Sequence, residues 1–216
     1  MATKARTAKF TQVVENRRND IVVVMEDIYD PHNAAAIYRT MDAFGLYKVY
    51  LVFKEEEEFN PKKVGKASSS SANKWMEFAV YAINSNIKTQ ITNQIQNSNN
   101  QAKYNKGGIK ECLQDLKKEG YTIVGTILDK EAENIYEHKW VEQKIALLVG
   151  NEHRGLSPEA IALCDQKIYI PMKGLVQSLN VSVATALSIA ELCAKKTLVP
   201  MSANTQKALL ENYLGK

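Results

Sequence analysis

The sequence lacks the features that define several large protein classes. It holds only three cysteines, Cys112, Cys164 and Cys193, which lie far apart and form no CxxC pair. This spacing indicates neither a zinc site nor a disulfide framework, and it is typical of reduced cytosolic thiols. No run reaches the ~18 apolar residues of a membrane-spanning helix, and the N-terminus has no signal-peptide core. The sequence therefore predicts a cytoplasmic protein without a membrane segment.

Motifs of several common enzyme classes are also missing. GxGxxG does not occur, and Leu156 stands where a phosphate-binding P-loop requires its lysine. HExxH and GxSxG are absent. The three histidines, His32, His138 and His153, are scattered, with no pair at metal-ligand spacing. We therefore expect no metal site and no serine-histidine-aspartate triad.

Short apolar runs alternate with amphipathic segments, which is the pattern of an α/β protein. Because the first strand, helix and strand follow one another directly, a crossover connection and a mostly parallel sheet are predicted. Ser157-Pro158 is expected to begin a further helix, as an N-cap followed by proline in the first turn. Strands are expected at 21–26, 47–53, 76–81, 121–128, 144–150 and 167–172. The other helices are expected at 9–18, 31–45, 108–120, 181–196 and 205–215.

Two polar stretches interrupt this alternation. Residues 54–59 form an acidic run that we interpret as a solvated loop. Residues 84–106 are rich in Asn, Gln and Lys, and we interpret them as a polar insertion that is poorly ordered or weakly helical. With few aromatic residues to stack on bases, the insertion is predicted to be a tolerated surface loop and not an RNA-binding element.

Positive charge gathers at the two ends of the chain. Residues 1–20 and 195–216 each have a net charge of +3, whereas the remainder has a net charge of −2. We therefore divide the chain into a basic N-terminal helical arm (1–20), a central domain (21–194) and a basic C-terminal helical extension (195–216). Such ends fit either two solvated helical tails or a phosphate-bearing partner, and charge alone favours solvated tails.

Three polar segments each follow an apolar strand, at the edge where open α/β sheets bind ligands. Each combines amide or charged side chains with small residues or exposed helix N–H groups, which allow a ligand to approach the backbone. Taken singly, each is equally well explained as a surface ion pair, a turn or a helix cap. The segments are DPHNAAAIYRTMDAFGL with Asn33 and Arg39, GNEHRG with Glu152, and IPMKGLVQSLNVSVATA with Ser178 and Asn180.

Taken together and in this order, the segments resemble the three signature motifs of the SpoU/TrmH methyltransferases of the SPOUT superfamily. The resemblance covers residues 9–196 apart from the polar insertion. It is strongest to the branch that methylates a guanosine of tRNA at the ribose 2′-oxygen. The features that indicate this branch are RRNDIVVVMEDIYDPHN, the SANKW segment, and PMKGLVQSLNVSVA without a large N-terminal substrate domain.

The resemblance implies a fold, a cofactor and an assembly. The expected fold is a mostly parallel α/β sheet flanked by helices, with a C-terminal trefoil knot, and residues 21–194 are the expected methyltransferase domain. The expected cofactor is S-adenosylmethionine, and the expected assembly is a homodimer with the active site at the subunit interface. The implied cofactor pocket consists of Thr126, Leu128, Gly150, Ile170, Met172, Ser178 and Leu179.

The same resemblance assigns catalysis to Arg39. Arginine is a difficult base because it normally stays charged, so stabilising the alkoxide that develops on the ribose is its physically easier role. Asn33, Glu152, Ser178 and Asn180 are expected to position Arg39 and the ribose.

With RNA as the implied substrate, the basic ends are expected to bind tRNA. Two alternatives stay open: 2′-O-methylation of rRNA, and a non-catalytic RNA-binding dimer, against which the intact motif residues argue. The expected RNA contacts are Lys9, Arg17, Arg18, Arg39, Lys195 and Lys196.

Overall fold

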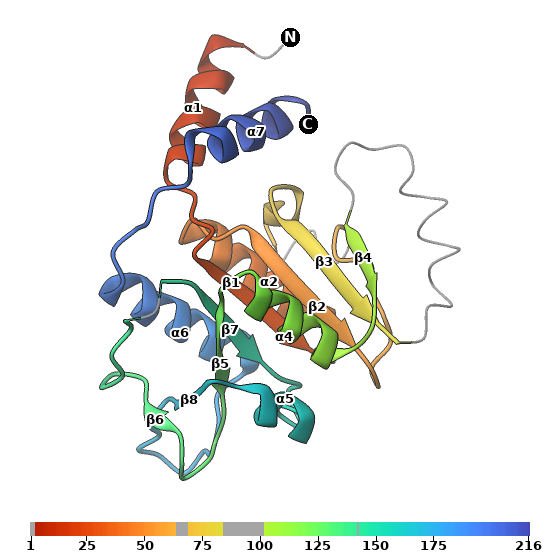
Figure 1. Cartoon of the computed structure of the whole chain (residues 1–216), viewed down its shortest axis with the longest axis vertical. Coiled ribbons are helices and arrows are strands. Elements are labelled where there is room, and N and C mark those ends of the chain that lie inside the picture. Colours follow the sequence, from red (N-terminus) through yellow and green to blue (C-terminus); the bar gives the residue numbers. More distant parts are fainter. Residues whose placement is uncertain (1–2, 64–68, 84–101, 142) are drawn as a thin grey trace.

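The centre of the protein is a parallel sheet with helices on both faces (Figure 1). The computed structural model describes residues 3–63, 69–83, 102–141 and 143–216. Across these residues the strand order is β4-β3-β2-β1-β7-β5-β8-β6, and each pairing is parallel, so the predicted class is confirmed. The strands are β1 (Ile21–Glu26), β2 (Lys48–Phe53), β3 (Glu77–Ala82), β4 (Lys103–Lys106), β5 (Thr122–Thr126), β6 (Glu133–Asn134), β7 (Ile145–Val149) and β8 (Gln166–Tyr169).

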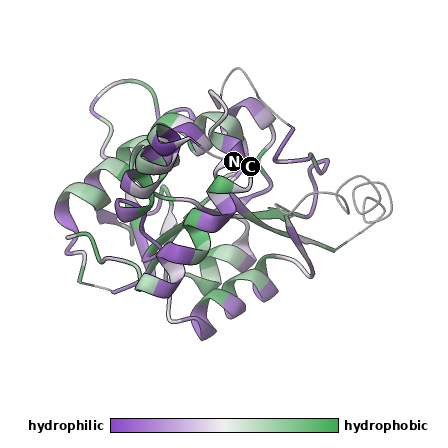
Figure 2. Cartoon of the chain, turned by 90° about the horizontal axis from the view of Figure 1, so that it is seen from above, coloured by the Kyte–Doolittle hydropathy of each residue, from purple (hydrophilic) through white to green (hydrophobic). Residues whose placement is uncertain are grey.

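Strand β1 explains why the sheet needs two layers of helices. Its side chains alternate between two hydrophobic cores: Val23 belongs to one and Val24 to the other. A strand buried on both faces is continuously apolar, as the run IVVVM is. In Figure 2 the strands are largely in the hydrophobic colour, whereas the helices change colour along their length. The helices are α1 (Lys4–Glu15), α2 (Pro31–Ala43), the short η1 (Ala72–Lys74), α4 (Ile109–Lys118), α5 (Pro158–Leu163), α6 (Val181–Lys195) and α7 (Ala203–Leu214).

The helices divide between the two faces of the sheet. Helices α2 and α6 contact each other and contribute to one core, whereas α4 and α5 contact each other and contribute to the second core. None of the helices in the described ranges has both the length and the apolar character that crossing a bilayer requires.

The predicted ends of α2 are confirmed in detail. The Asp30 side chain caps the helix by accepting from the backbone N–H of His32 at 2.8 Å, and proline occupies the first turn. At the other end Gly45 has a φ of 79°. The N–H groups of Gly45 and Leu46 donate to the carbonyls of Asp42 and Met41, which is the Schellman arrangement. Helix α2 is therefore fixed at both ends by its own sequence.

Several elements differ from the predictions, and the largest differences concern β4, β6 and α1. Residues 103–106, assigned to the polar insertion, form the edge strand β4, where Tyr104 packs against the hydrophobic core. An edge strand tolerates polar side chains, which explains why the composition concealed it. The rest of the insertion, 84–101, lies outside the described residues. The two-residue strand β6 was not predicted, and α1 begins at Lys4, five residues before the expected start.

The two ends of the chain pack against each other. Helices α1 and α7 are in contact and lie side by side in Figure 1. The rings of Phe10, Trp75 and Tyr213 meet between them and η1, with ring centroids 5.1 to 5.9 Å apart. Aromatic rings at such distances stabilise packing beyond the area they bury. The terminal helices are thus joined to each other and to the central domain.

Candidate active site

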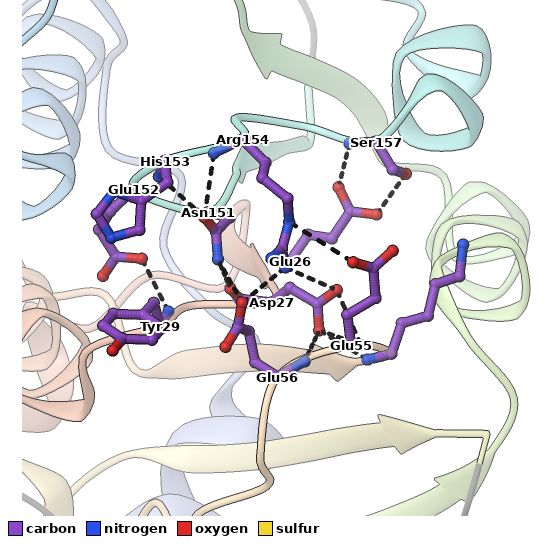
Figure 3. Close-up of polar contacts among 11 residues, drawn as sticks. Glu26, Asp27, Tyr29, Glu55, Glu56, Asn151, Glu152, His153, Arg154 and Ser157 are labelled. Atoms are coloured by element: carbon purple, nitrogen blue, oxygen red, sulfur yellow. Dashed lines mark hydrogen bonds and ion pairs between the residues drawn. The ribbon is translucent and has the colours of Figure 1, made fainter.

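The polar segments meet where the direction of the fold changes. Strands β1 and β7 are neighbours, but the chain leaves β1 towards α2 on one face and leaves β7 towards α5 on the other. In open α/β sheets such a switch point leaves a crevice outside the carboxyl ends of the strands. The loop after β1 and the loop after β7 lie against each other at this edge (Figure 3).

Glu152 is the centre of the contacts at this edge. Its carboxylate accepts hydrogen bonds from the backbone N–H groups of Tyr29 at 2.8 Å and Asp30 at 3.2 Å, and from Nδ2 of Asn33 at 2.8 Å. Oδ1 of Asn33 in turn accepts from Nδ2 of Asn180 at 3.1 Å. Hydrogen bonds between side chains therefore connect the three sequence segments, and we call this group of residues the Asn33–Glu152–Asn180 network.

Helix geometry fixes the two amides of this network. Asn33 lies in the first turn of α2, and Asn180 is the N-cap of α6. Oδ1 of Asn180 accepts from the backbone N–H of Ser182 at 2.8 Å and from its hydroxyl at 2.6 Å. The cap therefore orients the Asn180 amide so that its Nδ2 reaches Asn33. Because α2 and α6 pack together, the two asparagines are held at bonding distance.

The loop after β7 is tightly folded around Asn151. The backbone N–H and carbonyl of Asn151 both bond to Gly155, and its Oδ1 accepts from the N–H groups of His153 and Arg154. A Cβ atom on Gly150 would lie 2.3 Å from the carbonyl carbon of Gly155, so only glycine fits at position 150. Gly150 was predicted to line the cofactor pocket. Gly150 is not among the residues that line the pocket described below, and it permits the close turn that presents Glu152.

Acidic residues surround the other side of this loop. Nη2 of Arg154 lies 2.7 Å from the carboxylate of Glu56, and Nδ2 of Asn151 donates to the same carboxylate at 3.1 Å. The Asp27 carboxylate accepts from the backbone N–H groups of Lys54 and Glu55. The interpretation of residues 54–59 as only a solvated loop is therefore wrong at Glu56, which is half-buried in these contacts. Sequence reasoning missed these contacts of Glu56 and Asp27 because the bonded residues are distant from each other in the chain.

Glu26, the last residue of β1, connects the sheet to α5. It is buried, and its carboxylate accepts from the N–H of Ser157 at 2.8 Å and from its hydroxyl at 2.6 Å. Burial raises the pKa of Glu26, and the hydrogen bonds from Ser157 oppose part of that rise. Ser157 also caps α5 through the N–H of Ala160 at 3.1 Å, as predicted. The bond to Glu26 is the part that the sequence did not indicate.

A pocket lies beside the network, between the ends of β5 and β8 and the start of α6. Its wall is partly aliphatic, from Ile127 and Ile168, and partly polar, from Gln177 and Ser188. This mixture suits a ligand with a flat apolar part and polar substituents. Six residues predicted to hold the cofactor are in its lining: Thr126, Leu128, Ile170, Met172, Ser178 and Leu179.

Two catalytic candidates lie apart from the network. Ser178 lines the pocket, two residues before Asn180 on the same exposed loop. Arg39 is an exposed residue of α2, and within the described ranges its guanidinium forms neither a hydrogen bond nor an ion pair. The structure therefore unites Asn33, Glu152 and Asn180, whereas the guanidinium of Arg39 has no partner among the residues that the structure describes.

Two of the predicted RNA contacts are structural residues. Arg17 is 1% exposed; its guanidinium binds the Asp42 carboxylate, the Leu46 carbonyl and the Tyr213 hydroxyl. Arg18 is 4% exposed and forms a two-bond ion pair with Asp20, at 2.8 and 2.7 Å. A buried guanidinium with its donors occupied cannot reach a phosphate, so the prediction for these two arginines is corrected.

The predicted lysine contacts differ in how open they are. Lys9 is exposed on α1. Lys195 is paired with Glu191 at 2.7 Å, and its Nζ also donates to a backbone carbonyl. The Lys196 side chain is only 8% exposed and lies 3.5 Å from the Asp20 carboxylate, so it too is mainly structural. Among the described residues, no group of three His, Cys, Asp or Glu side chains is placed to hold a metal ion.

Comparison with known proteins finds a matching family and similar enzymes. The profile of the SpoU rRNA Methylase family matches residues 20–105 and 85–190. The chain is 31% identical over 191 residues to the tRNA (guanosine(18)-2′-O)-methyltransferase of Aquifex aeolicus, covering 88% of this chain and 77% of that protein. It is 32% identical over 192 residues to the enzyme of the same name from Thermus thermophilus, covering 88% of this chain and 82% of that one.

The fold agrees with the sequence similarity. The crystal structure of the Aquifex aeolicus TrmH/SpoU tRNA modifying enzyme superposes with a TM-score of 0.75 and 28% sequence identity. The match covers 97% of this chain and 95% of that chain. The superposition thus covers nearly the whole of both proteins, including the terminal helices.

Proposed function

The chain belongs to the SpoU rRNA methylase family, and on that premise we propose that it methylates a ribose 2′-hydroxyl of tRNA. The relatives named above act on guanosine 18 of tRNA, and we propose the same nucleotide here. The observation that carries the proposal is the Asn33–Glu152–Asn180 network, which lies next to a pocket lined by Ser178. A nucleotide held at the network would have its reacting hydroxyl beside the pocket that would hold the methyl donor.

S-adenosylmethionine is the methyl donor we propose, and it supplies an electrophilic sulfonium methyl group when bound. The pocket fits such a group because it offers both aliphatic and polar walls. Ile127 and Ile168 would contact the flat base, whereas Thr126, Gln177 and Ser178 would bind polar substituents. The chain around β5, β8 and the loop before α6 would form the trefoil knot implied by the resemblance.

Arg39 and Glu152 have different roles in the proposed methyl transfer. A ribose hydroxyl is a weak nucleophile and must lose its proton as it attacks, so charge develops on its oxygen. Arg39 is exposed and without an internal partner in the described chain, so its guanidinium is available to stabilise that oxygen. Glu152 accepts three N–H donors already, which suits it to positioning the segment after β1 and not to accepting the proton.

The RNA surface we propose is smaller than the sequence suggested. Lys9 on α1 and Arg39 on α2 remain as exposed cations that can contact phosphates, and Lys195 is partly exposed. Arg17, Arg18 and Lys196 contribute indirectly, by holding the chain around them in place.

We also propose a homodimer that works in the cytoplasm. Four apolar side chains are exposed close to the pocket, on the loop before α6 and on α6 itself. Exposed apolar patches commonly mark subunit interfaces, and a second copy of the chain would cover this one. The side chains are Leu175, Val176, Val183 and Leu187.

One experiment tests the proposed reaction. Purified protein and S-adenosylmethionine with a labelled methyl group are incubated with total RNA from a strain lacking the gene, and the modified nucleotide is mapped. The expected result is one 2′-O-methylguanosine in tRNA. Label in rRNA would favour the ribosomal alternative, and RNA binding without methylation would favour a non-catalytic dimer.

A further inference from the structure

Two aromatic side chains stand beside the Asn33–Glu152–Asn180 network, and the proposed reaction does not use them. Tyr29 follows β1 and is 59% exposed, and His153 follows β7 and is also exposed. Their rings meet edge to face, with centroids 5.3 Å apart and planes at 69° (Figure 3). Neither belongs to the two hydrophobic cores or to the lining of the proposed cofactor pocket.

The backbone of both residues is held by side chains of the site. The N–H of Tyr29 donates to Glu152 at 2.8 Å, and the N–H of His153 donates to Oδ1 of Asn151 at 2.9 Å. The backbone that carries the two exposed rings is therefore held in place by hydrogen bonds, although neither ring belongs to a hydrophobic core. Groups pre-organised in this way lose little conformational freedom when they bind a ligand.

We propose that Tyr29 and His153 form a stacking surface for a nucleobase of the substrate RNA, at the methylated nucleotide or its neighbour. This inference rests on the proposed function. Proteins that recognise RNA by sequence mostly bind single-stranded loops, in which bases are splayed out of the stack. A nucleotide that enters the crevice at the sheet edge would lose stacking in the same way. Aromatic rings stack on the π-face that every base has, which offsets the stacking that the RNA loses.

The surroundings favour a base over an apolar protein segment. The residues around the rings in Figure 3 are polar: the Glu152 carboxylate and Asn151 accept from the N–H groups of Tyr29 and His153, and Arg154 pairs with Glu56. Aromatic anchors in protein interfaces lie instead in well-packed, desolvated patches. The exposed aliphatic patch that suits a second copy of the chain is formed by other residues, on α6 and the loop before it.

The test compares steady-state kinetics of four variants on a tRNA transcript. Tyr29→Ala and His153→Ala should each raise KM for tRNA, because stacking on an aromatic side chain corresponds to roughly 5- to 150-fold in affinity per base. Tyr29→Phe keeps the ring and should stay within about twofold of the wild type. Phe44→Ala is the matched control, since Phe44 is an exposed ring at the opposite end of α2. The affinity for S-adenosylmethionine, measured by calorimetry, should be the same in all four.

A second measurement locates the base directly. A transcript with 6-thioguanosine at the methylated position, or at either neighbour, is irradiated with the wild-type protein. Mass spectrometry should find the adduct on the peptide that contains Tyr29 or the peptide that contains His153. An adduct only on other peptides would overturn the proposal even if an alanine variant were to fold poorly.

The outcomes separate this inference from the proposed function. If the wild type methylates no RNA, the proposed function fails. If the wild type is active and Tyr29→Ala and His153→Ala leave KM and kcat unchanged, the function stands and the stacking surface is wrong. Weakened binding of S-adenosylmethionine in Tyr29→Ala would also overturn the inference, because the ring would then belong to the cofactor pocket.

Discussion

Nδ2 of Asn33 donates a 2.8 Å hydrogen bond to the carboxylate of Glu152, 119 positions further along the chain. This contact joins the first turn of α2 to the loop after β7, at the point where the helices leave the sheet on opposite faces. Because Oδ1 of Asn33 is already used by Asn180, the direction of the Asn33 amide is fixed by both partners.

Because Asn33 is the donor and Glu152 the acceptor, substitutions that exchange the amide and the carboxylate have predictable effects. Glu152→Gln can direct an amide N–H₂ at the N–H₂ of Asn33, and we expect kcat to fall about 100-fold through misplacement of the site. Asn33→Asp alone should also be impaired, because it places two carboxylates together. The double variant restores a donor and an acceptor, so it should be more active than the product of the single effects. Strictly multiplicative losses would show that the contact does not matter for methyl transfer.

Arg39 should be required for reaction but not for stability. Its guanidinium has no internal partner in the described chain, so Arg39→Ala should leave the melting temperature and the affinity for S-adenosylmethionine nearly unchanged. We expect kcat to fall by about 100- to 1000-fold, as when a donor to a developing oxyanion is removed. Arg39→Lys keeps the charge and serves as the control for charge alone. Full activity of Arg39→Ala would remove this residue from the mechanism.

Arg17 should behave in the opposite way. Arg17→Ala removes the buried guanidinium that donates to the Asp42 carboxylate, the Leu46 carbonyl and the Tyr213 hydroxyl, and we expect the free energy of unfolding to fall by about 3 kcal/mol. Urea denaturation measures this loss. Lys9→Ala, on the exposed surface of α1, should leave stability unchanged but weaken tRNA binding and its salt dependence. A stable Arg17→Ala with weakened RNA binding would restore the interpretation that the structure corrected.

Lys62 predicts a dependence of stability on pH. Its Nζ is buried without a hydrogen-bond partner in the part of the chain that the structure describes, and burial lowers its pKa to about 8. The unfolded chain has the ordinary value of 10.5, so it binds more protons between these two values. This residue therefore destabilises the fold below pH 8, and the penalty declines as pH rises from 8 towards 10.5.

Replacing the amine with an apolar group should remove that penalty. We expect Lys62→Met to raise the free energy of unfolding by about 1–2 kcal/mol at pH 7, and to show a smaller gain at pH 10. Lys63→Met, at the exposed neighbouring position, is the control. An equal gain at both pH values would indicate a packing effect and not titration of the amine.

Much of the fold is visible in the sequence because it depends on neighbouring residues. The run at 21–26 is apolar at every position up to Met25, which is what a strand buried on both faces requires. The start of α2 at Asp30-Pro31 and its end at Gly45 follow from capping chemistry within a few residues. The edge strand β4 was missed because its four residues, KYNK, have only one apolar anchor.

The candidate site was predictable only in part. Asn33, Glu152 and Asn180 were selected from three separate segments, and the structure brings them into one network. Gly150 was also selected, and in the structure it allows the loop to close against Gly155. The bonds of Asn151 and Arg154 to Glu56 had no local signal, because an acidic run has the same composition whether it is solvated or paired.

The sequence by itself determined the α/β class, most of the strands and helices, their caps and the identity of the polar groups at the ends of strands. Only the tertiary structure decided which charges face solvent. Arg17 and Lys9 lie in the same basic N-terminal region, yet one binds Tyr213, 196 positions away, and the other is exposed. The physical reason is that periodicity and capping act over one or two turns, whereas desolvation of a charge depends on every segment that packs around it.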